Sequence, residues 1–408
     1  SQPGTEYFVN FSVTTVEPEP LIPAGYEIAY DQFQLPIQAE KRIYKANGPA
    51  LTTATSGDEL TVSSSKVNFV FNKKSGLVTS YKVDGTEYFK DGFGIQPNFW
   101  RAPNDNDYGN GAPKRLQVWK QSSKNFHVTD VKMTTENKVV SLKATYLLAA
   151  GNLYVVTYRI YPSGIVNVSA QFTSTDMQAA ETEVSEATRM ATFTPGSDAA
   201  RKAASKLEVP RIGVRFRLPA QMNNVQYFGR GPEENYIDRN HGTLVGVYKT
   251  TADKMYFNYV RPQENGHHTD TRWIALSPDK GNGLAIVADS LIGFNALRNS
   301  IEDFDSEEAL PHPYQWNNFS PEEVANHDEK AARNVLRRMH HVNDITPRDF
   351  VEVCVDMKQQ GVGGYDSWGA RPEPFHQIPA NRDYSWGFTL VPVRSASQAN
   401  EVAKYDYQ

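Results

Sequence analysis

Four ionisable side chains lie close together in the stretch YVRPQENGHHTDTRWIAL: Glu264, His267, His268 and Asp270. Carboxylates and imidazoles at such short separations could bind zinc or transfer protons to and from a substrate. The spacing differs from the His-Glu-x-x-His pattern of helical zinc sites, and Gly266 disfavours a helix. Three interpretations stay open: a metal site, an acid–base pair and, as the favoured one, a polar turn that leads into a buried strand.

The stretch YFGRGPEENYIDRNHG combines acids with arginines: Arg230, Glu233, Glu234, Asp238 and Arg239. Two carboxylates can hydrolyse a glycoside when the protein holds them about 5–5.5 Å apart. The adjacent Glu233 and Glu234 would point to opposite faces of a strand, so one strand would not pair them. We therefore favour a loop in which arginines pair with carboxylates.

The stretch FWRAPNDNDYGNG is rich in residues that form turns. Asp105, Asn106 and Asp107 resemble the first ligands of a calcium loop, but the bidentate glutamate that closes such a loop is missing. We expect Asx turns here and predict no metal site. Arg101 could form a forked pair with a carboxylate elsewhere in the fold.

A single tryptophan, Trp368, stands among glycines in the stretch GVGGYDSWGARPEPF. Glycine permits positive φ and close backbone approach, whereas tryptophan presents a wide apolar face with one N–H donor. The ring could pack under its own loop as a plug, or it could be a platform for a flat ligand such as a sugar.

The composition excludes several classes of protein. The chain has 408 residues and a net charge of −5 with acids and bases well mixed, so it has no basic patch for nucleic acid. No apolar run approaches the ~18 residues of a membrane span. Cys354 is the only cysteine, so no disulfide framework is possible, and its stretch FVEVCVDM alternates like a buried strand. The compartment, bacterial cytoplasm or periplasm, stays open.

The elements that must position these residues are strands, because period-two alternation is common and helical periodicity is scarce. In the stretch LYVVTYRIYPSGIVNVSAQF, for example, alternate residues share one face on both sides of a Pro-Ser-Gly turn. We predict an all-β fold, a large antiparallel sandwich. The one clear helix signal is an N-cap with Pro and acids after it, at residues 320–323.

The domain organisation is predicted in four parts. Residues 1–36 read as one long-looped hairpin, the last of a small β-sandwich, and two strands alone cannot hide an apolar face. Residues 37–57 fit a linker, residues 58–395 the large sandwich and residues 396–408 a tail. The chain begins without Met and enters a strand at once, as a piece of a longer protein would.

Four motifs occur in a fixed order along the chain: RAPNDNDYG, FGRGPEENYIDR, VRPQENG and GVGGYDSWG. Together they resemble the C-terminal part of the large bacterial β-galactosidases of glycoside hydrolase family two. The resemblance implies a β-supersandwich similar to galactose mutarotase, preceded by the end of an immunoglobulin-like domain. The stretch of residues 301–318 looks like an added loop compared with that family.

The resemblance also implies what this chain lacks. In that family two glutamates on a barrel earlier in the chain carry a retaining mechanism, and magnesium and sodium bind there. No catalytic residue and no cofactor are therefore expected here. The tryptophan of the GG-x-D-S-W loop lines the sugar entrance in the family, which implies a substrate-binding role for Trp368, with Gly363, Gly364 and Asp366 supporting the loop.

Three functions follow as hypotheses. The favoured one is an accessory region of a β-galactosidase that is inactive alone. Its partners would be the N-terminal domains and the barrel of the same chain, and its ligand a β-galactoside or galactose. The parent enzyme would be a homo-oligomer. The second is a mutarotase or epimerase. The third is a carbohydrate-binding module that uses exposed aromatics, Trp100, Trp273 and Trp368. A polar cluster is a further candidate for ligand contact: Arg230, Glu234, Arg261, Glu264, His267 and His268.

Overall fold

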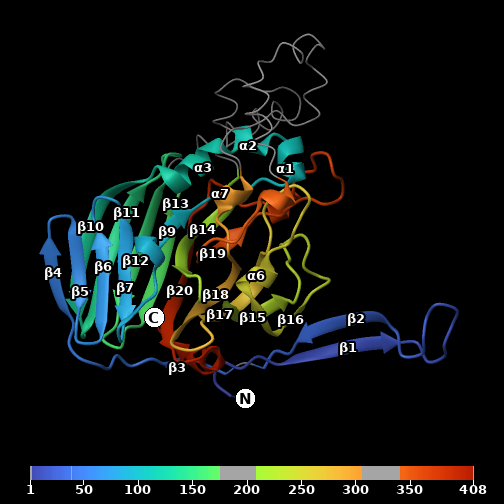
Figure 1. Ribbon diagram of the computed structural model, residues 1–408, viewed down its shortest axis with the longest axis horizontal. Helices are drawn as coiled ribbons and strands as arrows, with labels where there is room; N and C mark the ends of the chain where they lie inside the picture. Colours follow the sequence, from blue (N-terminus) through green and yellow to red (C-terminus); the bar gives the residue numbers. More distant parts are fainter. Residues whose placement is uncertain (1, 38, 175–207, 306–340, 408) are drawn as a thin grey trace, which may run out of the picture.

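A computed structural model describes residues 2–37, 39–174, 208–305 and 341–407, and its described part is built mainly from antiparallel strands (Figure 1). Twelve strands form one large sheet in the order β10-β11-β12-β13-β20-β18-β17-β15-β16, with β19, β14 and β9 branching from β18. Their bounds are β9 Gln96–Asn98, β10 His127–Glu136, β11 Val139–Leu147, β12 Leu153–Ile160, β13 Val166–Thr173, β14 Arg211–Pro219, β15 Asn224–Gly231, β16 Leu244–Thr251, β17 His268–Ser277, β18 Gly283–Leu297, β19 Phe350–Gln359 and β20 Tyr384–Val393. The predicted all-β antiparallel fold is confirmed.

The long strand β18 makes the sheet branch. Its first half, residues 283–288, pairs with β20, and its second half, residues 293–297, pairs with β19. Both halves are buried, whereas Ser290 and Leu291 between them are exposed. The strand thus changes partner at its exposed middle. The second branch of the sheet continues from β19 to β14 and from β14 to β9.

β12 and β13 pair so that the residues predicted to share one face lie opposite each other. Tyr154 lies opposite Phe172, and Tyr158 lies opposite Val168. All four side chains are fully buried on one face. Removing a side chain of this size from water contributes roughly 1.5–3 kcal/mol to folding.

A second sheet of five strands covers that face. It runs in the order β4-β5-β6-β7-β8, with bounds Thr52–Ser56, Glu59–Ser63, Val67–Asn72, Leu77–Val83 and Thr86–Glu87. Phe69 and Phe71 of β6 point onto Tyr158 of β12, with ring centroids 5.7 and 6.1 Å apart. One part of the core therefore lies between this sheet and the β10–β13 part of the large one, which Figure 1 shows beside each other. The same core continues into β14, β18 and β19. β4 pairs with β5 although it lies inside the predicted linker, and the domain boundaries stay a prediction.

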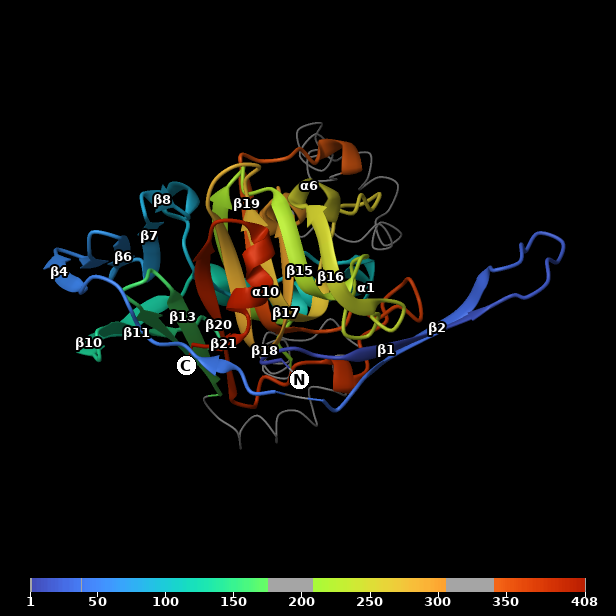
Figure 2. The same cartoon turned by 90° about the horizontal axis from the view of Figure 1, so that it is seen from below.

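The predicted N-terminal hairpin forms from β1, Phe8–Thr14, and β2, Glu27–Gln34. It projects from the body of the molecule (Figure 2), and Phe11 and Phe33 are more than half exposed. Its contacts with the body include hydrogen bonds beside β16: the Tyr30 hydroxyl donates to the carbonyl of Gly242, and the Gln32 side-chain amide donates to the carbonyl of Val245 and accepts from its N–H. At the base of the hairpin, Phe8 packs on Phe228 of β15 with ring centroids 6.5 Å apart. Its membership of an immunoglobulin-like domain stays a prediction.

The described helices are short: α1 Asp105–Gly109, α2 Ala112–Arg115, α3 Gln117–Lys124, α6 Ala252–Met255, α7 Ile301–Phe304 and α10 Ala399–Val402. The expected Asx bonding near residue 105 is present: Asn104 accepts from the N–H of Asp107 at 2.8 Å, and Asn110 accepts from that of Ala112 at 3.2 Å. The bond of Asn104 also caps the short helix α1, which was not expected. The helix predicted at residues 320–323 and most of the 301–318 insertion lie outside the described residues. Among the described residues, no helix has the length and hydropathy to cross a membrane.

Candidate functional site

Trp368 lies on the segment between β19 and β20, and its side chain is 73% exposed. A plug under its own loop would be buried, so that interpretation is wrong. The loop nevertheless has a defined shape, because Asp366 Oδ1 accepts from the N–H groups of Trp368 at 3.1 Å and Ala370 at 2.9 Å. The ring is therefore displayed to solvent on a backbone that is held in place.

Two glycines let the loop take this path. Gly363 and Gly364 have φ values of +74° and +134°, which side-chain-bearing residues rarely adopt. A Cβ on Gly363 would also lie 2.8 Å from the carbonyl oxygen of Ala370. Any other residue at Gly363 would strain the backbone and push the two sides of the loop apart.

The first motif supports the loop from α1. Asn106 donates to the carbonyl of Asp366 at 3.0 Å and accepts from the N–H of Gly369 at 3.2 Å. At Gly109, a Cβ would come within 2.5 Å of the carbonyl oxygen of Trp368, so α1 and the loop pack backbone against backbone. Sequence reasoning missed the role of Asn106, although the motif that contains it was recognised.

A buried arginine fixes the start of the loop. Arg101, only 2% exposed, makes a forked pair with Asp107 at 2.9 and 3.0 Å. Its remaining N–H groups donate to the carbonyls of Gln360 at 2.8 Å and Gly361 at 3.0 Å. The predicted forked pair of Arg101 is thus present, with a carboxylate six residues along the chain.

The second motif holds the other side of the loop. Asp238 accepts from the N–H of Val362 at 3.0 Å and from that of Gly363 at 2.9 Å. Its neighbour Arg239 pairs with Glu234 at 2.8 Å. The expected loop of arginine–carboxylate pairs is therefore present, and it contacts the segment that carries Trp368.

The third motif joins the same region through Glu234 and Arg261. Glu234 accepts from the hydroxyl of Tyr259 and from the N–H of Gly266 at 2.7 Å. Arg261 pairs with Asp105 of α1 at 2.9 Å and stacks on the Tyr108 ring at 3.9 Å. Three motifs, far apart in sequence, thus lie around the loop that the fourth motif forms.

Two residues of the predicted polar cluster support turns elsewhere. Arg230 pairs with Asp270 at 2.5 Å and donates to the carbonyl of Thr243 at 2.8 Å. His268 is buried, and its ring nitrogens face the carbonyls of Gly266 at 3.0 Å and Pro232 at 3.2 Å. Both side chains therefore form hydrogen bonds with backbone carbonyl groups of nearby turns.

Glu264 and His267 belong to a buried ionic cluster. Glu264, 5% exposed, pairs with Arg211 at 2.9 Å, and the Arg211 Nε lies 3.2 Å from Asp356. His267 Nδ1 lies 3.8 Å from Asp356. Burial raises the pKa of Asp356 to about 7 and lowers the pKa of His267 well below its ordinary value. These acids and bases face one another inside the fold, as the favoured interpretation of a polar turn before a buried strand requires.

The remaining sequence candidates have structural roles. Trp100 and Trp273 are buried, so of the three proposed aromatic platforms only Trp368 is exposed. Cys354 is buried in β19, as predicted. Within the described ranges, no group of three His, Cys, Asp or Glu side chains could hold a metal ion.

Comparisons with known proteins agree with the four-motif resemblance. Residues 63–390 match the family model of the β-galactosidase small chain. The chain is 33% identical over 373 residues to a β-galactosidase of Priestia megaterium and 25% identical over 377 residues to one of Streptococcus thermophilus; each alignment covers 91% of this chain. The chain spans about 30% of the length of these relatives.

Among solved structures, a galactose mutarotase related enzyme from Lactobacillus acidophilus aligns with 83% of this chain and 98% of its own length, at 9% identity and a TM-score of 0.40. The family match covers most of the chain, and one relative exceeds 30% identity over nearly all of it. This chain belongs to the β-galactosidase small chain family.

Proposed function

We propose that this chain is the C-terminal region of a β-galactosidase that hydrolyses terminal β-D-galactosides, and that it is inactive alone. Its contribution is Trp368, which stands at the entrance of an active site formed with the rest of the longer protein. The length of the relatives supports this proposal, because about 70% of each lies outside the matched region.

The observation that carries the proposal is the contrast between the exposed ring and its fixed backbone. Trp368 is 73% exposed, yet its loop is held by Asn106, Asp238 and Asp366. Holding a loop in one conformation lowers the entropy lost when a ligand binds to it. A large aromatic face presented in this way suits stacking against the apolar C–H side of a sugar.

The chemistry of such an enzyme would come from outside the described residues. A retaining glycosidase needs a nucleophilic carboxylate and an acid/base carboxylate about 5–5.5 Å apart. Among the described acids near the Trp368 loop, Asp105, Asp107, Glu234, Asp238 and Asp366 are each bonded to an arginine or to backbone N–H groups. We place both catalytic carboxylates, and the magnesium and sodium ions of the parent, in the remainder of the longer protein.

The mutarotase alternative is not favoured. It requires an acid and a base that reach a sugar in an open cavity, and Glu264, His267 and His268 are at most 5% exposed. Glu264 already pairs with Arg211. The binding-module alternative loses two of its three aromatic platforms, because Trp100 and Trp273 are buried.

The test is Trp368→Ala in the full-length β-galactosidase. Loss of the stacking face should raise KM by about 5- to 30-fold, since one aromatic contact with its burial is worth roughly 1–2 kcal/mol. Trp368→Phe should recover part of that loss. Phe375→Ala is the matched control, because Phe375 is 72% exposed on the same segment. An unchanged KM in Trp368→Ala would remove the proposed role.

A further inference from the structure

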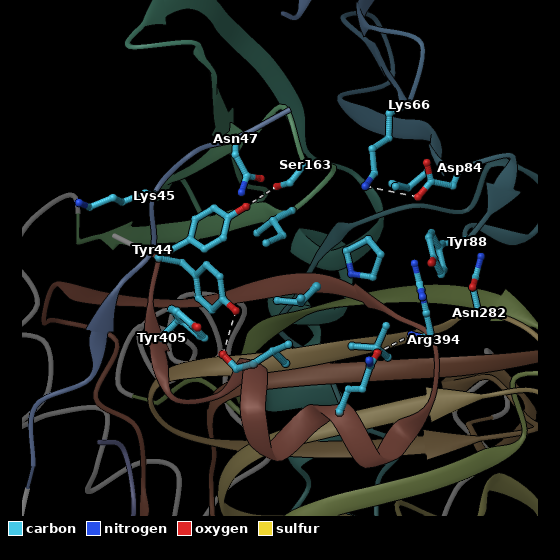
Figure 3. A pocket seen from close by; sticks show the side chains of 18 of the residues that line it. Tyr44, Lys45, Asn47, Lys66, Asp84, Tyr88, Ser163, Asn282, Arg394 and Tyr405 are labelled. Atoms are coloured by element: carbon cyan, nitrogen blue, oxygen red, sulfur yellow. Dashed lines mark hydrogen bonds and ion pairs between the residues drawn. The ribbon is translucent and has the colours of Figure 1, made fainter. Parts of the chain in front are cut away.

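A cavity of about 660 Å³ lies away from the Trp368 loop, between the five-stranded sheet, β20 and the C-terminal segment (Figure 3). Its wall includes residues beside β3, Arg42–Ile43, which pairs in parallel with β21, Tyr405–Asp406. β3 and the C-terminus are at one end of the molecule in Figure 1 and α1, which supports the Trp368 loop, is at the other. The volume falls within the roughly 300–1,000 Å³ typical of small-molecule sites.

Four tyrosines line this cavity together with aliphatic side chains: Tyr44, Tyr88, Tyr405 and Tyr407. Tyr44 is held in place, because its hydroxyl donates to Ser163 Oγ at 2.7 Å and its ring packs on Tyr407 with centroids 5.1 Å apart. Amide side chains of Asn47 and Asn282 also line the wall. Aromatic faces beside amides and hydroxyls form a suitable lining for a saccharide, whose rings have an apolar C–H side and a polar edge.

Two cations on the wall, Arg394 and Lys45, have no acid partner among the described residues. Lys66 pairs with Asp84 at 3.4 Å, and Figure 3 shows this pair at the end of the cavity where Arg394 also lies. Within the described part of the chain, the Arg394 guanidinium has no ion pair or hydrogen bond, and only its backbone N–H is engaged, with Gln398. Lys45 also belongs to the wall, but in Figure 3 its ammonium points away from the cavity.

A free guanidinium favours an anion of matching shape. Its planar N–H groups can donate in parallel to two oxygens of a carboxylate or a sulfate. The local charge is positive, with Lys66 and Arg394 against Asp84, in a chain whose net charge is −5. The cavity thus offers a fork for an anion at one end and the rings of Tyr44 and Tyr405 at the other.

We propose that this cavity binds an acidic saccharide, a sugar unit that carries a carboxylate or a sulfate, with Arg394 forming a forked pair with the anionic group. The choice of a saccharide rests on the proposed function, whereas the anionic group follows from Arg394 itself. The cavity would be a second carbohydrate site, separate from the Trp368 loop and without catalytic groups of its own.

Isothermal titration calorimetry on the 408-residue chain tests this proposal. The probes are galacturonic acid, galactose 6-sulfate and neutral galactose, at equal ionic strength. We expect at least one acidic probe to bind, and galactose to bind at least about tenfold more weakly, because a charge-assisted pair is lost. The acidic probe that binds more tightly identifies the natural anion as a carboxylate or a sulfate.

Variants locate the binding. Arg394→Gln should weaken the acidic probe about tenfold, and it should fold normally because the Arg394 side chain makes no hydrogen bond to the described residues. Lys45→Gln is the matched control, with the same loss of charge on a side chain that points away. Trp368→Ala should leave this binding unchanged.

Three results would overturn the proposal: no heat with either acidic probe, equal binding of neutral galactose, or a loss of binding in Trp368→Ala while Arg394→Gln still binds. The last result would assign the acidic saccharide to the Trp368 loop. The role of Trp368 in the full-length enzyme is measured separately by KM, so either proposal can fail without the other.

Discussion

Replacing Asp238 with alanine should release the loop that carries Trp368. The carboxylate accepts from the N–H groups of Val362 and Gly363 at 3.0 and 2.9 Å. A hydrogen bond to a charged group contributes about 1.5–3 kcal/mol, and partial exposure of Asp238 places each bond at or below the lower end of that range. The two bonds together therefore stabilise this side of the loop by about 2–3 kcal/mol.

Local hydrogen exchange measures this loss directly. A change of 2–3 kcal/mol corresponds to about 30- to 150-fold faster exchange at the two amides, if they exchange through local opening. Mass spectrometry of a peptide spanning residues 360–370 should show the increase, while peptides from β12 and β13 stay protected. Asp238→Asn, which keeps one acceptor oxygen, should lie between wild type and Asp238→Ala.

The matched control is Asp58→Ala, which removes an exposed carboxylate from a turn. The Asp58 side chain forms no hydrogen bond or ion pair with the described residues. It should leave exchange in residues 360–370 unchanged. If Asp238→Ala exchanges at the wild-type rate there, the carboxylate does not hold the loop and the account of a fixed backbone under Trp368 is wrong.

Three further predictions test other parts of the fold. Burial raises the pKa of Asp356 to about 7, so between about pH 4 and pH 7 the native state binds more protons than the unfolded state and stability falls as pH rises. Between pH 5 and pH 8, the free energy of unfolding in urea should fall less in Asp356→Asn than in the wild type. If the two curves of unfolding free energy against pH run parallel, this prediction is contradicted. Glu208 is buried and forms ion pairs with Arg115 and Arg371. In urea unfolding, Glu208→Ala should lower the free energy of unfolding by about 3–5 kcal/mol, and Glu208→Gln by less. A loss below about 1 kcal/mol would mean that these two ion pairs are not needed for stability. In polarimetry, the chain should not speed the relaxation of fresh α-galactose, because the candidate acid–base residues are buried; a faster relaxation would restore the mutarotase alternative.

Strands were more predictable than helices for a physical reason. In β12 and the second half of β13, buried side chains alternate with more exposed ones, so the sequence itself carries the period of two. In α3, the buried residues are Trp119, Ser122 and Ser123, which do not form an apolar stripe. Trp119 packs on Phe99 and Phe172 from distant elements, so this helix is held by tertiary contacts more than by its own pattern.

The candidate site divides in the same way. The motif order and the isolated Trp368 were visible in the sequence, and they led to the loop that the structure displays. The ionic partners of the histidine-rich stretch were not visible. Arg211 lies more than fifty residues before Glu264. They meet because β9 pairs with β14, and the N–H of Glu264 donates to the carbonyl of Ala102 just after β9.

The sequence by itself determined the strand-rich fold class, the faces that strands such as β12 bury and the family resemblance. Each depends on residues that are neighbours along the chain or on motifs that can be read in order. Only the tertiary structure decided that Glu264 is neutralised by Arg211, that Asp238 and Asn106 hold the loop of Trp368, and that Arg394 faces an open cavity. Contacts of this kind depend on how distant strands pair, and a local pattern of residues does not specify that pairing.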